Sequence, residues 1–206
     1  MYPIMLDLRG RTSLVVGAGQ IALRKLLGLL AEGAVVTVVA PKVIVPINRL
    51  ARDGEVKLIE RHFLDSDLDG MELVLLATGD RQVEQRVSQL CKKRKVWVNA
   101  ADVPALCDFH LPSVITRGDL RLCLASGGGA PFAVRRLREL LEYKLGPTWG
   151  VWMTAARRFR GMVRARGLGK READACFDRF FAETVDIESL AVRVPSEQEQ
   201  EAWLLS

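Results

Sequence analysis

A turn of small residues near the start of the chain constrains its fold most strongly. The apolar run 13–16 leads into Gly17 and Gly19, and an amphipathic helical pattern follows over 21–31. A buried strand, a glycine turn and a helix in this order are typical of the start of a βαβ unit. Gly17 permits the tight turn out of the strand, Gly19 lets a ligand approach the backbone, and small Ala22 lets the helix pack closely on a sheet.

The first hundred residues repeat this alternation of β-branched apolar runs and helical patterns. It predicts an α/β fold with a Rossmann-like parallel sheet and right-handed crossovers. We expect strands at 13–16, 35–40, 56–59, 73–77 and 96–99, and helices at 21–31, 46–52 and 81–93.

The pattern changes after Pro112. The runs 113–116 and 120–125 predict a hairpin, and Pro131 suits the first turn of a helix that ends near Leu145. From Trp149 onward further helices are expected, because no strand signal is found there. No structure is assigned to the polar stretch 197–201. Domain boundaries are therefore expected near Pro112 and Gly146.

Composition limits the class of protein. The chain has 206 residues, of which 49% are apolar, which is enough for a sizeable core. It has no apolar run as long as a membrane helix and no signal-peptide pattern at its start, so we expect a cytoplasmic protein that does not enter a membrane. Its four cysteines are scattered and it has only two histidines, so reduced thiols and no protein metal site are expected.

Charge is distributed unevenly in the second half. Residues 135–171 contain eleven Lys or Arg and two acids, whereas 172–206 contain nine acids and two Arg. The two stretches could attract each other, or the basic stretch could meet an anionic ligand or nucleic acid.

The glycine turn also predicts a ligand. The helix that follows it presents free N–H groups and the positive end of its dipole, which stabilise phosphate without a lysine. We therefore expect a nicotinamide dinucleotide here. The second strand ends at Pro41 and Lys42, with no acid for the ribose hydroxyls. Lys42 could favour a 2′-phosphate or simply be solvated, so the choice between NAD and NADP stays open.

Two further strand ends should border the same crevice. Thr78, Gly79 and Asn99 lie at these ends, where Thr78 and Asn99 can hydrogen-bond ribose or nicotinamide. Asp80 is better explained as the cap of the helix that begins at Arg81.

Five segments carry a more specific pattern. They are Val16-Gly17-Ala18-Gly19-Gln20-Ile21-Ala22-Leu23-Arg24-Lys25, Leu75-Leu76-Ala77-Thr78-Gly79-Asp80, Val98-Asn99-Ala100-Ala101-Asp102, Phe109-His110-Leu111-Pro112-Ser113 and Ala125-Ser126-Gly127-Gly128-Gly129-Ala130-Pro131. In order and spacing they resemble precorrin-2 dehydrogenase, the N-terminal module of sirohaem synthase. The resemblance covers about residues 3–145, and the helical remainder only in character.

This resemblance implies oxidation of precorrin-2 to sirohydrochlorin with NAD as acceptor. In bifunctional relatives it also implies insertion of iron, with ferrous ion as a second substrate. It also implies a homodimer. With the boundaries expected above, it gives a Rossmann domain over 1–112, a dimerisation segment over 113–146 and a helical, substrate-covering domain over 147–206.

The resemblance also implies roles for particular residues. Asp102 matches a carboxylate proposed as a general base, and a carboxylate there could accept the proton lost as hydride leaves; the alternative is a turn-forming residue. Ser126 matches a serine that is phosphorylated in some relatives. Its turn with Gly127 and Gly128 could bring backbone N–H groups close to a substrate carboxylate, although a plain reversal is as good an explanation. His110 stands where the family usually has an apolar residue. It could touch iron or substrate, but a histidine that is merely hydrogen-bonded in a packed region is the better explanation.

For eight other residues the resemblance implies contact with a ligand through charge or shape. Dinucleotide contacts are implied for Gln20, Ile21, Pro41 and Lys42, and contacts with the eight substrate carboxylates for Arg117, Arg121, Arg135 and Arg136. Each arginine alone is better explained as a solvated or dimer-contact residue. Two other functions stay open: dehydrogenation without metal insertion, and a dinucleotide-sensing protein whose basic helices bind nucleic acid, for which no recognition-helix motif is found.

Overall fold

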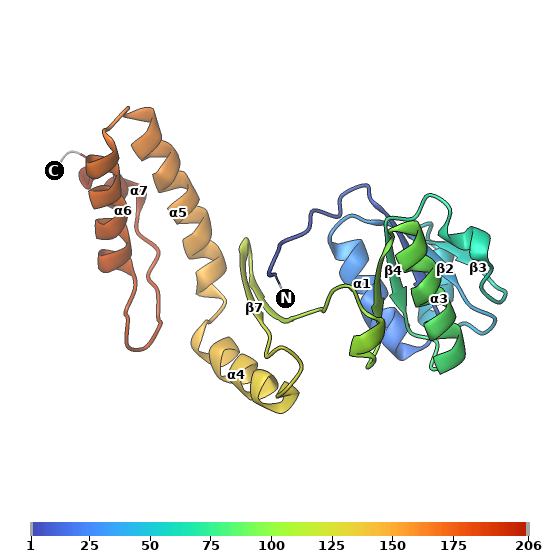
Figure 1. Cartoon of the computed structure of the whole chain (residues 1–206). Coiled ribbons are helices and arrows are strands. Elements are labelled where there is room, and N and C mark those ends of the chain that lie inside the picture. Colours follow the sequence, from blue (N-terminus) through green and yellow to red (C-terminus); the bar gives the residue numbers. More distant parts are fainter. Residues whose placement is uncertain (1, 205–206) are drawn as a thin grey trace. The chain divides into compact units, whose positions relative to one another are not determined.

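The computed structural model describes residues 2–204 and forms two compact units that meet in the chain between Leu111 and Pro112 (Figure 1). The first unit contains β1 (Thr12–Val16), α1 (Gln20–Ala31), β2 (Val35–Val39), α2 (Val45–Arg52), β3 (Lys57–Ile59), β4 (Leu73–Leu76), α3 (Arg81–Arg94) and β5 (Trp97–Ala100), with short 3-10 helices η1 (Asp65–Leu68) and η2 (Pro104–Leu106). All the strands and helices expected in this unit are present, and their bounds differ from the expected ones by one residue at most.

The five strands form one sheet in the order β3-β2-β1-β4-β5, and every neighbouring pair is parallel. This confirms the expected Rossmann-like fold. Val16 at the end of β1 lies opposite Val39 of β2 and Leu76 of β4, and Leu76 lies opposite Ala100 of β5. The carboxyl ends of four strands therefore lie side by side, and the segments that follow them share one edge.

Helices cover both faces of this sheet. On one face Ala22 and Leu26 of α1 and Ile47 of α2 pack in a buried cluster with Val38. On the other face Val87 and Cys91 of α3 pack with strand residues such as Leu76. Because each strand is covered on both faces, its apolar run is continuous rather than alternating.

The second unit contains a hairpin and four helices. They are β6 (Ser113–Arg117), β7 (Leu120–Leu124), α4 (Pro131–Lys144), α5 (Thr148–Ala165), α6 (Lys170–Thr184) and α7 (Glu197–Ala202). The stripe Trp152, Phe159 and Val163 of α5 is buried in one aromatic cluster with Phe180 of α6. Leu120 and Leu122 of the hairpin pack against the same cluster, so the residues before and after Gly146 share a core.

The segment 197–204 is more ordered than the sequence predicts. Residues 197–201, to which no structure was assigned, belong to α7. Ser196 caps this helix, because its side chain accepts a hydrogen bond from the Glu199 N–H while Glu199 accepts one from the Ser196 N–H. Trp203 then packs in the core of the second unit, which holds the short helix in place. An isolated antiparallel bridge between Val185 and Val192 is also present where only helices were expected.

None of the helices in the described chain is long and apolar enough to cross a membrane.

Candidate functional site

The glycine turn joins three strand ends. Gly17 has φ of 106°, a value that L side chains rarely adopt, and a Cβ atom there would lie 2.2 Å from the Ala77 carbonyl oxygen. The Gly17 N–H donates to the Val39 carbonyl oxygen at 2.9 Å. Only glycine fits this position, because β1 turns into α1 in direct contact with the ends of β2 and β4.

The N-terminus of α1 is open to a ligand. Gly19 is its N-cap residue, no side chain caps the helix, and its first turn has no acidic residue. A Cβ on Gly19 would meet nothing within 4 Å. Gln20 and Ile21 are exposed, whereas Ala22 is fully buried against the sheet. The free N–H groups and the helix dipole therefore fit the pyrophosphate of a dinucleotide, as the sequence predicted.

The segment after β2 borders this turn. Pro41 and Lys42 are exposed, and the Ile44 N–H donates to the Ala18 carbonyl oxygen at 3.2 Å. This hydrogen bond holds the segment beside the glycine turn. Both interpretations of Lys42, a partner of a 2′-phosphate or a solvated lysine, are compatible with its exposure.

The segment after β4 has a partner that the sequence analysis missed. The Thr78 N–H and hydroxyl both donate to Oε1 of Glu84, at 3.1 and 3.2 Å, and the Glu84 side chain is buried on α3. Asp80 caps α3, because its Oδ1 accepts from the N–H groups of Gln82 and Val83. The cap preferred for Asp80 is confirmed, and Gly79 beside it is exposed.

Asn99 does not stand free for a ligand as expected. Its Oδ1 accepts from the Lys25 ammonium at 2.7 Å, and its Nδ2 donates to the Phe109 carbonyl oxygen at 2.9 Å. Asn99 is buried, so in this structure its amide orders the protein. The sequence does not predict Lys25 as a site residue, although it is the last residue of the first of the five segments. Its position on the apolar stripe of α1, between Ala22 and Leu29, was the available signal.

Asp102 follows β5 at the carboxyl edge of the sheet. It is exposed and has φ of 57°, in the left-handed region that asparagine and aspartate tolerate better than most residues. Its carboxylate makes no hydrogen bond or ion pair with another described residue. The preceding Ala101 N–H donates to the Leu76 carbonyl oxygen at 3.1 Å, which fixes the turn to the end of β4. Asp102 therefore presents an exposed carboxyl group beside the strand ends.

The predicted substrate residues lie in the second unit. Ser126, Gly127 and Gly128 form an exposed turn before α4, in which the Ser126 hydroxyl accepts from the Ala130 N–H at 3.2 Å. Arg121 is exposed on β7. Arg135 and Arg136 are exposed on α4 and both approach Glu139, at 3.9 and 2.9 Å. Such surface pairs are weak and leave these arginines accessible to anions.

Arg117 has a structural role that differs from the predicted one. Its Nε donates to the Leu145 carbonyl oxygen at 2.7 Å and its Nη2 donates to the Glu142 carbonyl oxygen at 3.0 Å. These carbonyls lie at the C-terminal end of α4, where helix carbonyls lack partners within the helix. Arg117 thus joins the hairpin to α4, and we do not retain it as a substrate residue.

Replacement of Arg117 by Leu is expected to lower the free energy of unfolding by about 1.5–3 kcal/mol, because two carbonyls lose a charged donor. Arg135→Leu is the matched control and should change stability by less than about 0.5 kcal/mol, since its contact with Glu139 is long and exposed. Urea unfolding followed by tryptophan fluorescence measures both. Equal effects would contradict the structural role of Arg117.

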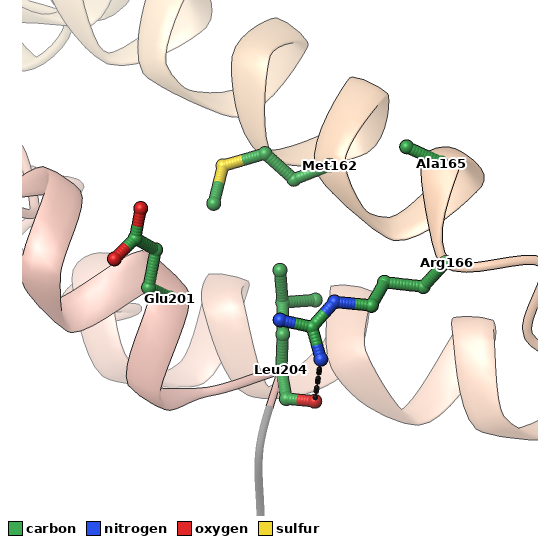
Figure 2. Close-up of a pocket in the computed structure, with 5 residues that line it drawn as sticks. All are labelled: Met162, Ala165, Arg166, Glu201 and Leu204. Atoms are coloured by element: carbon green, nitrogen blue, oxygen red, sulfur yellow. Dashed lines mark hydrogen bonds between the residues drawn. The ribbon is translucent and has the colours of Figure 1, made fainter.

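No metal site is found among residues 2–204. His110 is exposed, and the described residues include no group of three or more His, Cys, Asp or Glu placed to hold a metal ion. The second unit contains a cavity of about 330 Å³, and Figure 2 shows the residues that line it: Met162, Ala165, Arg166, Glu201 and Leu204. Arg166 donates to the Leu204 carbonyl oxygen there, at 3.3 Å. None of the predicted site residues lines this cavity.

Known proteins agree with the resemblance found in the sequence. The chain is 36% identical over 200 residues to "Siroheme synthase" of Nitrosococcus oceani, and 40% identical over 162 residues to "Siroheme synthase" of Pseudomonas fluorescens. These alignments cover 97% and 79% of the chain but 42% and 35% of the relatives. The chain therefore spans about two fifths of the length of these relatives.

A solved structure matches from end to end. "SirC, precorrin-2 dehydrogenase" is 28% identical, with a TM-score of 0.79, and the match covers 100% of this chain and 98% of that one. A family model described as "Putative NAD(P)-binding" matches residues 4–113, which hold the whole glycine turn and the sheet. Because this model matches more than half of the chain, the chain belongs to that NAD(P)-binding family, in agreement with the nicotinamide dinucleotide expected at the glycine turn.

Proposed function

We propose that the chain oxidises precorrin-2 to sirohydrochlorin with NAD as the hydride acceptor. The observation that carries this proposal is the end-to-end match in fold with a structure whose title names precorrin-2 dehydrogenase. The site agrees with it, because an open helix N-terminus suited to a dinucleotide and the free carboxylate of Asp102 lie at the same edge of the sheet.

The chain contributes binding and proton transfer to this reaction. When bound, NAD accepts a hydride from a substrate carbon. The N–H groups at the start of α1 would hold the pyrophosphate, and Gly19 would leave room for it. The substrate also loses a proton as its new double bond forms, and the Asp102 carboxylate accepts this proton. Two electrons and one proton leave as hydride and the second proton goes to Asp102, so the oxidation is balanced.

An anaerobic assay tests the proposal. Purified protein with precorrin-2 and NAD should give sirohydrochlorin absorbance and NADH in equal amounts, and a sample without NAD serves as the control. A folded protein that yields neither product would overturn the proposal. Affinity for duplex DNA that falls steeply with salt and changes with NADH would instead favour the dinucleotide-sensing alternative.

We further propose that the functional form is a homodimer whose contacts include α4. This helix has no buried residue, although it is rich in apolar side chains. Phe132 is 71% exposed, Tyr143 87% and Leu140 53%, while Leu141 packs against the core of the second unit. Apolar side chains in this number on an outward helix face are typical of a protein interface.

The Phe132→Asp/Tyr143→Asp double variant is expected to weaken the dimer by about 2–4 kcal/mol, which is roughly 30- to 1,000-fold in Kd, because buried aromatic residues dominate such interfaces. Ile187→Asp is the control, since Ile187 is 81% exposed in the same unit but outside α4. Analytical ultracentrifugation measures the three proteins. A monomeric wild type would refute the dimer, and an unchanged double variant would refute the α4 interface.

Three finer statements stay predictions. The carboxylates of the substrate are proposed to bind to Ser126, Gly127, Gly128, Arg121, Arg135 and Arg136. Insertion of ferrous ion into sirohydrochlorin is tested by supplying both to the protein; a rate no faster than in buffer would reject it. The cytoplasm is the expected compartment.

A further inference from the structure

Lys25 is an unusual charged residue of α1. It is 9% exposed, yet it forms no ion pair with a carboxylate in the part of the chain that the structure describes. Its ammonium donates to two neutral acceptors, Asn99 Oδ1 at 2.7 Å and the Leu76 carbonyl oxygen at 3.3 Å. A buried charge with neutral partners costs stability compared with an apolar side chain of similar size. Stability alone therefore does not explain a lysine here.

Titratable groups from several elements influence the charge of Lys25. Burial lowers the pKa of the Lys25 ammonium below its usual value, and Cys107, Glu84 and Asp102 oppose this change while neighbouring Arg24 adds to it. Asp102 is thus one of the groups that favour the charged form of Lys25.

The hydrogen bonds of Lys25 converge on the turn that carries Asp102. The Leu76 carbonyl oxygen accepts from Lys25 Nζ and also from the Ala101 N–H, at 3.1 Å. Asn99, the other partner of Lys25, lies two residues before Ala101. The turn is thus attached on one side through Asn99 and on the other through the end of β4.

The segment that follows the Asp102 turn returns to Asn99 and Ala100 and is bonded to them. Asn99 Nδ2 donates to the Phe109 carbonyl oxygen at 2.9 Å, and the Cys107 Sγ lies 3.2 Å from the Ala100 N–H nitrogen and 3.3 Å from the Val103 carbonyl oxygen. Residues 100–107 therefore form a loop that is closed at its base by the Asn99 and Cys107 side chains. Lys25 fixes the orientation of Asn99 at that base.

We propose that Lys25 is a positioning residue for the reaction: through Asn99 and the Leu76 carbonyl it holds the loop 100–107, so that the Asp102 carboxylate stays in place at the carboxyl edge of the sheet. The expected effect on catalysis rests on the proposed function, whereas the hydrogen bonds that hold the loop do not. Lys25 acts through Asp102 and does not itself exchange a proton with the substrate.

The first test is kinetic. Lys25→Met is expected to lower kcat for precorrin-2 oxidation by about 10- to 100-fold, as is usual when a supporting residue of a site is lost, and to change KM for NAD by less than about twofold. Lys92→Met, an exposed lysine of α3, is the matched control and should keep the wild-type rate. In an Asp102→Asn background the same Lys25 change should lower kcat further by less than about twofold, because its effect passes through Asp102.

The second test needs no substrate or cofactor. Hydrogen exchange measured by NMR on the ligand-free protein should show at least about tenfold faster exchange of the Ala101 N–H in Lys25→Met, with unchanged exchange in the strand interior of β1. In Lys25→Gln, which keeps an amide donor group, the exchange rate of the Ala101 N–H should lie between those of the wild type and Lys25→Met. A wild type without dehydrogenase activity would refute the proposed function. The exchange measurement would then still test whether Lys25 holds the loop.

Unchanged exchange at Ala101, or a kcat loss that is equal with and without Asp102, would overturn the positioning role. Loss of folding in both Lys25 variants, judged by circular dichroism, would also overturn it, since Lys25 would then be a structural residue.

Discussion

Asp102→Asn is expected to lower kcat for precorrin-2 oxidation by about 10²- to 10⁴-fold, the range typical of a lost general base. The amide has nearly the same size as the carboxylate but cannot accept the proton that the substrate releases. Asparagine also tolerates the φ of 57° at this position, so the turn should keep its conformation. The change therefore removes the chemical group and leaves the backbone in place. Anaerobic turnover and NADH fluorescence titration measure rate and binding separately.

The expected pattern is a low rate with NAD affinity within about twofold of wild type, since the dinucleotide is held at the start of α1 rather than by this carboxylate. Asp53→Asn provides the matched control, because Asp53 is an exposed aspartate at the end of α2. A variant that turns over within about twofold of wild type would show that Asp102 only forms the turn. Loss of NAD binding together with rate would show that the site had collapsed.

The parts of the site that could be predicted are those set by local sequence. The glycine turn, the sheet and the Asp80 cap each depend on a few neighbouring residues and on the alternation of strands and helices. The helix over Glu197–Ala202 was predictable too, because Ser196 and Glu199 have the spacing of a capping box. It was missed because the stretch was judged by its polarity, while Trp203, which anchors it, lies just beyond.

The parts that could not be predicted depend on contacts between distant segments. Asn99 and Arg117 are side chains of the right type for ligand contacts, but both bond backbone carbonyls far along the chain, those of Phe109 and Leu145. The sequence shows which groups can donate or accept, and the fold decides which acceptors lie within reach. Lys25 is intermediate, because its place among buried residues of α1 was visible but its partner 74 residues away was not.

Gly17→Ala is expected to lower the free energy of unfolding by about 2–6 kcal/mol. Two costs combine: a backbone conformation that alanine rarely adopts, at φ of 106°, and a methyl group placed 2.2 Å from the Ala77 carbonyl oxygen. Relief of this clash would separate the turn from the end of β4. NAD affinity should therefore fall by at least about tenfold, or ~1.4 kcal/mol, wherever the variant still folds. Urea unfolding and NADH fluorescence titration test the two expectations.

Gly19→Ala separates binding from stability, because Gly19 has an ordinary φ of −92° and a methyl group there would meet no protein atom within 4 Å. We expect it to cost about 1 kcal/mol of stability at most, as for a weak helix cap, and to lower NAD affinity by about tenfold, since the methyl group fills the space over the N–H groups of α1. Wild-type affinity in this variant would show that the pyrophosphate does not approach at Gly19. Wild-type stability in Gly17→Ala would show that the turn can open without cost, and the close contact between β1 and β4 would then not be what fixes the start of α1.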